Sequence, residues 1–154
     1  MKPSSWDILQ ALQRALHERP EQSLANFWAS LSDEPPEQAQ LLSAELLRQQ
    51  LYSGLVRPWE RLKRDKQKKS VLKKRLATEW STFEILNLQP ALARKPVTLS
   101  FVLEFLRNAV SHDKLRLDGE LNATFSDWEQ NRLRFTLPEL QQFITAFRQF
   151  REEG

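Results

Sequence analysis

The spacing of apolar residues changes near His112, and this change constrains the fold more than any other feature of the chain. Up to that point apolar residues recur every three or four positions, as on one buried face of a helix. From Leu121 to Leu137 they alternate with polar residues, which is typical of paired strands, and after Pro138 the helical spacing returns. Only three glycines occur, which favours helices over tight turns. The pattern predicts a mainly α fold, a helical bundle with one β-hairpin before the C-terminal helix.

A chain of 154 residues fits one domain, spanning 1–154, with a core of its own. The expected helices carry these apolar stripes: Leu9, Leu12 and Leu16 after a cap at Ser4 or Ser5; Leu24, Phe27, Trp28 and Leu31 after Pro20; Leu41, Ala44, Leu47 and Leu51, ending near Gly54; Leu72, Leu76, Trp80 and Phe83 in a long helical region; a helix beginning at Val97; and Leu140, Phe143, Ile144 and Phe147 after Pro138. The expected hairpin has DWEQN between two strands, one in which Leu121, Ala123 and Phe125 alternate with polar residues and one in which Leu133, Phe135 and Leu137 do so.

Composition and motifs exclude several kinds of chemistry. The chain has no cysteine, so disulfides and thiolate metal sites are excluded. His17 and His112 are far apart and outside any HExxH pattern, and no glycine-rich loop precedes a helix. We therefore expect no metal and no cofactor. The opening MKPSSWDILQ lacks the apolar segment of a secretory signal, and no apolar run approaches the roughly 18 residues of a membrane span. These features lead us to expect a cytoplasmic protein.

Positive charge is concentrated in one part of the chain. Residues 57–75, called the basic segment below, hold ten basic residues against two acidic ones, whereas the remainder holds 13 basic and 18 acidic residues. One interpretation is a solvated helix face. The other is a surface that binds a polyanion through its phosphates, as basic clusters do for nucleic acids. The residues that we expect to contact RNA under the second interpretation are Lys68, Lys69, Lys73 and Lys74.

The stretch FLRNAVSH places three polar residues, Arg107, Asn108 and His112, on an otherwise apolar helix. Asn108 and His112 are four residues apart and share a face. Arg107 and His112 are five apart, roughly 140° around an ideal helix, so they converge only through the reach of arginine or if the helix ends near His112. One interpretation is a catalytic site, since a guanidinium binds phosphate and an imidazole transfers protons. The other interpretation is solvent exposure or a structural hydrogen bond.

The segment RNAVSH resembles the RNxxxH signature of the HEPN superfamily, with Arg107, Asn108 and His112 in the three motif positions. The resemblance implies a small helical bundle and a metal-independent ribonuclease that cleaves RNA through the substrate's own 2′-hydroxyl. It also implies a homodimer in which two motifs form one composite site, a toxin or phage-defence role, and a cognate antitoxin or inhibitor as a further partner. The alternative is a non-catalytic HEPN-like domain that binds RNA or a nucleotide, or acts as a scaffold.

One position departs from the pattern of HEPN toxins paired with a nucleotidyltransferase antitoxin. In those toxins the modified tyrosine stands two residues after the histidine. Here that position is Lys114, and the only tyrosine of the chain is Tyr52. The resemblance therefore does not extend to that mode of regulation, although the motif itself is complete.

Overall fold

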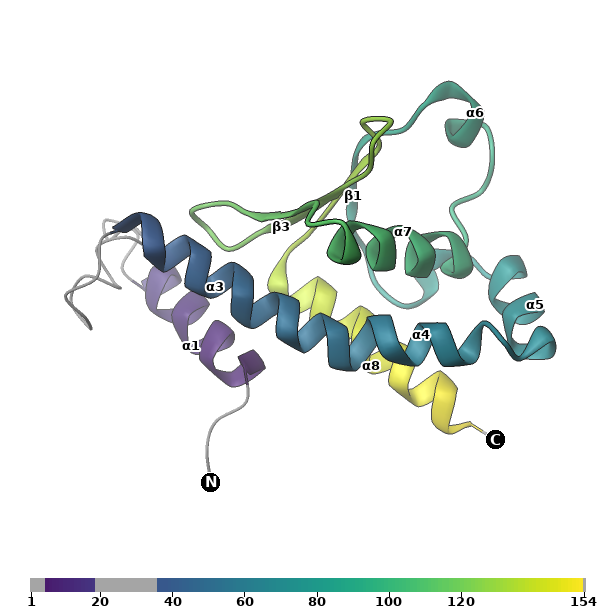
Figure 1. The fold of residues 1–154 in the computed structure, drawn as a ribbon, viewed down its shortest axis with the longest axis horizontal. Coiled ribbons are helices and arrows are strands. Elements are labelled where there is room, and N and C mark those ends of the chain that lie inside the picture. The colour runs from purple at the N-terminus through teal and green to yellow at the C-terminus, as the bar shows by residue number, and fades with distance from the viewer. Residues whose placement is uncertain (1–4, 19–35, 154) are drawn as a thin grey trace.

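A nearly continuous helical path over residues 36–62 forms the base of the molecule (Figure 1). The computed structural model describes residues 5–18 and 36–153. In it α3 (Pro36–Leu51) runs through a π-helical turn, η1 (Tyr52–Val56), into α4 (Arg57–Leu62). α1 (Ser5–Glu18) packs beside α3 and buries Trp6 and Leu9. The side chains of Leu12, Leu16 and Leu41, and the helix expected at residues 20–31, lie outside the described residues.

The prediction that the third helix ends near Gly54 is wrong, because the chain stays helical through η1. Proline has no N–H to donate, so Pro58 at the start of α4 removes one α-helical hydrogen bond, and the wider π-turn lies directly before it. Gly54 has a packing role instead. A Cβ atom at this position would lie 3.2 Å from Cγ2 of Ile144, so the glycine allows close approach of α8 (Leu137–Glu152).

The long helical region predicted through Phe83 is also wrong. α5 (Lys66–Lys74) ends at Arg75, and the chain continues through a 3-10 turn, η2 (Ala77–Glu79), into a strand, β1 (Glu84–Asn87). The reason is tertiary hydrogen bonding: the Ala77 N–H donates to the Val97 carbonyl at 2.9 Å, and the Leu99 N–H donates to the Arg75 carbonyl at the same distance. These bonds replace the intrahelical ones beyond residue 74.

The hairpin predicted from the alternating residues is confirmed and belongs to a larger sheet. β3 (Ala123–Ser126) pairs antiparallel with β4 (Arg132–Phe135) in a register that aligns Phe125 with Leu133. β2 (Leu115–Leu117) and β1 add to its two sides, which gives the strand order β1-β4-β3-β2. The two outer strands were not predicted, since each is short and lies beside a helix or turn. The fold is mainly α, as predicted, with one small antiparallel sheet.

α7 (Leu99–Ser111) lies between this sheet and the α3–α4 path (Figure 1). A short helix, α6 (Pro90–Ala93), lies in the connection that leads to it. α8 crosses the base at η1, and its Thr136 cap forms a reciprocal capping box with Glu139. Aromatic rings fill the space beneath the sheet; Trp80, for example, meets Phe143 edge-on at 5.3 Å. α7 is thus the central helix of the core, and the sequence motif lies on it.

Candidate functional site

The sequence of α7 explains where the helix begins and which face remains polar. The Thr98 hydroxyl caps its first turn by accepting the Phe101 N–H at 3.2 Å. The buried residues form one broad stripe: Leu99, Val102, Leu103, Phe105, Leu106, Ala109 and Val110. Arg107 and Asn108 lie outside this stripe, each partly exposed. The helix is therefore anchored by its apolar face and presents the motif on the other.

α7 ends at the motif histidine. His112 is the C-cap residue, and Asp113 after it adopts the left-handed conformation with φ 56°. The Lys114 N–H returns to the Ala109 carbonyl at 2.7 Å and the Asp113 N–H to the Val110 carbonyl at 3.4 Å, the two bonds of a Schellman turn. A short polar side chain such as aspartate tolerates this conformation better than most. His112 therefore stands at the very end of the helix, which is the condition under which Arg107 and His112 can approach one ligand.

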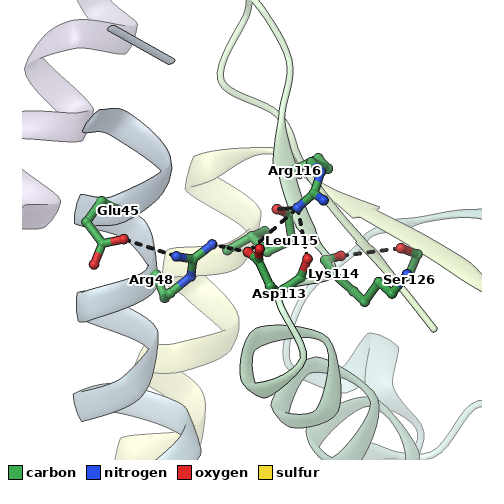
Figure 2. Close-up of polar contacts among 7 residues, drawn as sticks. All are labelled: Glu45, Arg48, Asp113, Lys114, Leu115, Arg116 and Ser126. Carbon is green, nitrogen blue, oxygen red and sulfur yellow. Dashed lines mark hydrogen bonds and ion pairs between the residues drawn. The ribbon is translucent and has the colours of Figure 1, made fainter. Parts of the chain in front are cut away.

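The turn after His112 is held from two sides, as Figure 2 shows. Arg48 of α3 forms an ion pair with the carboxylate of Asp113. Arg116 of β2 donates through Nη1 to the Asp113 carbonyl at 2.9 Å. These contacts tie the end of α7 to both the helical base and the sheet. They fix the backbone that carries His112, while the imidazole itself is exposed.

Arg107 is held by two groups, one near it in sequence and one far from it. Its Nε donates to a carboxylate oxygen of Glu60 at 2.9 Å, its Nη2 donates to the same oxygen, and its Nη1 donates to the side-chain oxygen of Asn108 at 2.9 Å. The Arg107 side chain is 27% exposed. Three of the five N–H groups of a guanidinium are thereby used, so two remain for a ligand.

Glu60 is a stable counter-ion for this arginine. The hydrogen bond from Arg107, and then its positive charge, hold the pKa of the Glu60 carboxyl below its usual value of 4.5. Burial opposes this to a smaller extent, and the charges of Lys63 and Arg64 add to the lowering. Glu60 is therefore ionised at neutral pH, and the guanidinium of Arg107 is kept in one orientation by charge as well as by geometry.

The structure brings Arg107 and Asn108 into contact and leaves His112 one helical turn beyond Asn108. The His112 N–H donates to the Asn108 carbonyl at 2.9 Å, so the two residues follow one another on the same side of the helix. Within the described part of the chain, no hydrogen bond or ion pair engages the His112 imidazole. Both nitrogens of the ring are thus free to exchange protons with a ligand placed at the helix end.

A groove of about 840 Å³, called the motif groove below, runs along the polar side of α7 as far as Asn108. α4, α5 and the β3–β4 turn form its other walls. Its lining residues are Trp59, Lys63, Arg64, Lys69, Ser100, Phe101, Glu104, Phe105, Asn108 and Asp127. The lining combines three cations with two acids and with the stacked rings of Phe101 and Phe105, whose centroids lie 5.8 Å apart. The acid Glu104 is engaged by the Trp59 indole N–H and lies 3.9 Å from Lys63.

The four lysines singled out in the basic segment lie in different surroundings. Lys69 lines the motif groove, whereas Lys73 and Lys74 line a second, largely apolar hollow of about 670 Å³ between α5 and the approach to α7. Lys68 lines neither of these two. None of the four forms an ion pair with another described residue. Of the set, Lys69 is thus the residue that shares a cavity with the motif.

Two contributors to the site were missed by sequence analysis. Glu60, which holds Arg107, had one available signal: it is one of only two acids among the ten cations of the basic segment. Arg48, which holds the turn at Asp113, had none, because nothing in the sequence distinguishes it from any other helix arginine. Among residues 5–18 and 36–153, no group of three or more histidine, aspartate or glutamate side chains is placed to hold a metal ion. No helix of the same residues has the length and apolarity to cross a membrane.

Comparison with known protein families gives one match that covers almost the whole chain. A family model described as HEPN pEK499 p136 matches residues 2–153. No curated protein and no solved structure was found to match the chain. With its helical bundle, its late hairpin and the motif at the end of α7, the chain belongs to the HEPN pEK499 p136 family.

Proposed function

We propose that the protein is a metal-independent endoribonuclease of HEPN type in which Arg107, Asn108 and His112 act on RNA. The observation that supports this most is the place of His112: it is the C-cap residue of α7, one turn beyond Asn108, which contacts Arg107 and lines the motif groove. HEPN domains are often ribonucleases. The proposal assigns proton transfer to His112, phosphate binding to Arg107 and orientation of the guanidinium to Asn108.

The substrate supplies the nucleophile in this reaction. The imidazole of His112 accepts the proton of a ribose 2′-hydroxyl, whose oxygen attacks the neighbouring phosphorus. An O2′–P bond forms, the P–O5′ bond breaks, and the departing 5′-oxygen takes a proton from a second acid. The two remaining N–H groups of Arg107 donate to the phosphate oxygens, where negative charge grows in the transition state. The products are a 2′,3′-cyclic phosphate and a 5′-hydroxyl.

The second acid is the reason to propose a homodimer. One imidazole cannot accept and donate a proton in the same step, and the chain holds only one histidine besides His112, which is His17. Each copy would therefore supply one His112 to a composite site where two α7 ends meet. The exposure of His112 leaves it accessible to a second copy. Sedimentation at tens of micromolar should give a dimer; a strict monomer with full activity contradicts this part of the proposal.

Contacts between lysines of the basic segment and the phosphates of the RNA backbone would position the RNA. If Lys68, Lys69, Lys73 and Lys74 each contact one phosphate, their reversal to glutamate should reduce the slope of log affinity against log salt by about 3, at ~0.7 per phosphate for a single strand. Because only Lys69 shares the motif groove, the Lys68→Glu/Lys69→Glu pair should weaken binding more than Lys73→Glu/Lys74→Glu. An unchanged slope in all variants means that the segment is a solvated surface.

A non-catalytic binding or scaffold domain is the second candidate, and the Arg107–Glu60 ion pair favours it. An arginine with three of its five N–H groups engaged within the fold has the surroundings of a structural residue. In that case Arg107→Lys should cost stability only. Under the ribonuclease proposal it should also slow cleavage at equal folded fraction, because a point charge cannot reproduce the bidentate fork.

The biological role that we propose is a toxin or phage-defence effector restrained by a cognate antitoxin or inhibitor. Overexpression in a bacterial host should arrest growth, and His112→Ala should abolish the arrest while circular dichroism shows an unchanged fold. Growth arrest that persists in a folded His112→Ala variant favours the binding-domain candidate.

The reaction itself is tested with purified protein and an end-labelled single-stranded RNA in the presence of EDTA. Cleavage should proceed, and it should fail on DNA of the same sequence or when the ribose at the scissile position is 2′-deoxy. Cleavage that requires an added divalent metal, or that tolerates the 2′-deoxy substitution, contradicts the proposed chemistry.

A further inference from the structure

Two loops of the sheet have the same design. The turn between β2 and β3 reads DGELN (118–122), and the turn between β3 and β4 reads DWEQN (127–131). In the first, one carboxylate oxygen of Asp118 accepts the N–H groups two and four residues on, at 2.8 and 2.9 Å. In the second, one carboxylate oxygen of Asp127 accepts the N–H groups of Glu129 and Asn131, at 2.9 Å each. The final asparagine amide closes both loops on the aspartate, at 3.1 and 2.8 Å.

The two loops differ at the position after the aspartate, which is Gly119 in one and Trp128 in the other. A Cβ atom at Gly119 would meet nothing within 4 Å, so this position faces open space. Trp128 is 73% exposed, whereas Trp59 and Trp80 are buried. The sister loop folds with glycine there, and hence the loop geometry does not require an indole. The exposed indole is therefore available to stack on a ligand.

The loop backbone that carries this ring is held by hydrogen bonds to the end of β1 and the chain after it. Asn131 is fully buried, and its side-chain oxygen accepts the Gln89 N–H at 2.7 Å. In return, Nε2 of Gln89 donates to the Glu129 carbonyl at 2.7 Å, and Nδ2 of Asn87 donates to the Gln130 carbonyl at 2.8 Å. Braced in this way, the turn presents Trp128 at little conformational cost to a ligand.

Trp128 lies at the same end of α7 as the motif. Nζ of Lys114, two residues after His112, stands 3.9 Å from the centre of the indole ring. The Lys114 carbonyl accepts the N–H and hydroxyl of Ser126 at 3.1 and 3.3 Å, which fixes the chain after His112 against the start of the Trp128 loop (Figure 2). Asp127, adjacent to Trp128, lines the motif groove together with Asn108.

We propose that Trp128 and Lys114 form a subsite for one unpaired nucleotide of single-stranded RNA, which rests on the proposed ribonuclease function. The exposed indole stacks on the base, and the ammonium of Lys114 pairs with an adjacent phosphate. Every base presents a π-face, so the subsite selects unpaired RNA without selecting a sequence. It holds the strand beside the end of α7, where the scissile phosphate meets His112.

The sister loop supplies the test variant, because Trp128→Gly reproduces a turn that already folds in this protein. Binding is measured in a His112→Ala background with a short single-stranded oligoribonucleotide and with a duplex of the same sequence. Trp128→Gly should weaken single-strand binding about 5- to 150-fold, the range for loss of one base–aromatic stack, while Trp128→Phe retains most of the affinity. The salt dependence should be unchanged by Trp128→Gly and reduced by Lys114→Gln.

A matched control moves the indole to the other loop. The double variant Trp128→Gly/Gly119→Trp keeps the composition of the protein and should bind as weakly as Trp128→Gly alone. The subsite is overturned if Trp128→Gly binds the single strand as tightly as its parent, if the relocated indole restores binding, or if Trp128→Gly only changes the oligomeric state. The same holds if the His112→Ala parent binds no single-stranded RNA.

Cleavage assays separate failure of the subsite from failure of the ribonuclease proposal. With Trp128 intact, single-stranded RNA that is bound but not cleaved by the native protein contradicts the ribonuclease and leaves the subsite standing. Cleavage by Trp128→Gly with an unchanged KM contradicts the subsite and leaves the ribonuclease standing. If both are right, Trp128→Gly raises KM for single-stranded RNA by the factor seen in binding.

Discussion

Replacing Asp113 by glycine and by alanine should give the opposite stability order of these two residues to that found within a helix. Asp113 has φ 56°, a conformation that costs an alanine roughly 1–2 kcal/mol and glycine nothing. Both substitutions also remove the ion pair with Arg48, worth about 0–1 kcal/mol because the Asp113 side chain is 70% exposed. Asp113→Ala should therefore lower the free energy of unfolding by about 1–3 kcal/mol.

Asp113→Gly loses the same ion pair, but glycine adopts the left-handed conformation without steric cost. The greater flexibility of glycine in the unfolded chain lowers the free energy of unfolding by about 0.4–1 kcal/mol. The free energy of unfolding of Asp113→Gly should stay within about 1 kcal/mol of that of the native protein and exceed that of Asp113→Ala by roughly 1 kcal/mol. Within a helix the order is the reverse, with alanine favoured over glycine by about 0.5–1 kcal/mol. Urea unfolding followed by far-ultraviolet circular dichroism measures the difference. An alanine variant as stable as the glycine variant, or more so, refutes the left-handed turn after His112.

Three further outcomes follow from the core and from the Glu60 carboxylate. Leu103→Ala should cost about 2–5 kcal/mol in urea unfolding, because Leu103 is fully buried in the central helix; a cost below 1 kcal/mol would show that the helix is misplaced. Glu60→Gln should destabilise the protein at pH 7 and slow RNA cleavage, because Arg107 loses the charge that orients it; unchanged kinetics would mean that this orientation is immaterial. The pKa of Glu60 lies below 4.5, so its contribution is complete above that pH and is lost only as pH falls through the lowered pKa. The stability difference between native protein and Glu60→Gln should accordingly hold from pH 8 to 5 and shrink below 4.5; shrinkage between pH 7 and 6 would contradict the assignment.

The elements that sequence analysis predicted well are those specified by local signals. α7 has its own cap at Thr98 and an unbroken apolar stripe, and the β3–β4 pair alternates cleanly about a polar turn. β1 could not be predicted, since Leu76, Trp80 and Phe83 follow one another at helical spacing. What ends α5 is a set of hydrogen bonds to the chain before α7, and these depend on the assembled fold. Gly54 likewise has a role set by a neighbour, Ile144, that lies far along the chain.

The candidate site likewise has some features that could be predicted from the sequence and others that depend on the assembled fold. The condition that α7 must end near His112 was visible in the residue spacing, and the Schellman turn at Asp113 meets it. The partner of Arg107 was not visible, because Glu60 lies 47 residues earlier and reaches it only through the packing of α4 against α7. Trp128 was predicted only as part of a turn. Its exposure and the comparison with Gly119 are what distinguish it from an ordinary turn residue.

Single-turnover cleavage of a single-stranded RNA by native protein and by His112→Ala, both in EDTA, tests the central claim most directly. Loss of a positioned proton-transfer group should slow the reaction by about 10²–10⁴. The fold should be unchanged, since His112 is exposed and its backbone hydrogen bond does not depend on the side chain. Mass spectrometry of the native reaction should find a 2′,3′-cyclic phosphate on the upstream fragment. A folded His112→Ala variant that cleaves as fast as the native protein contradicts the account.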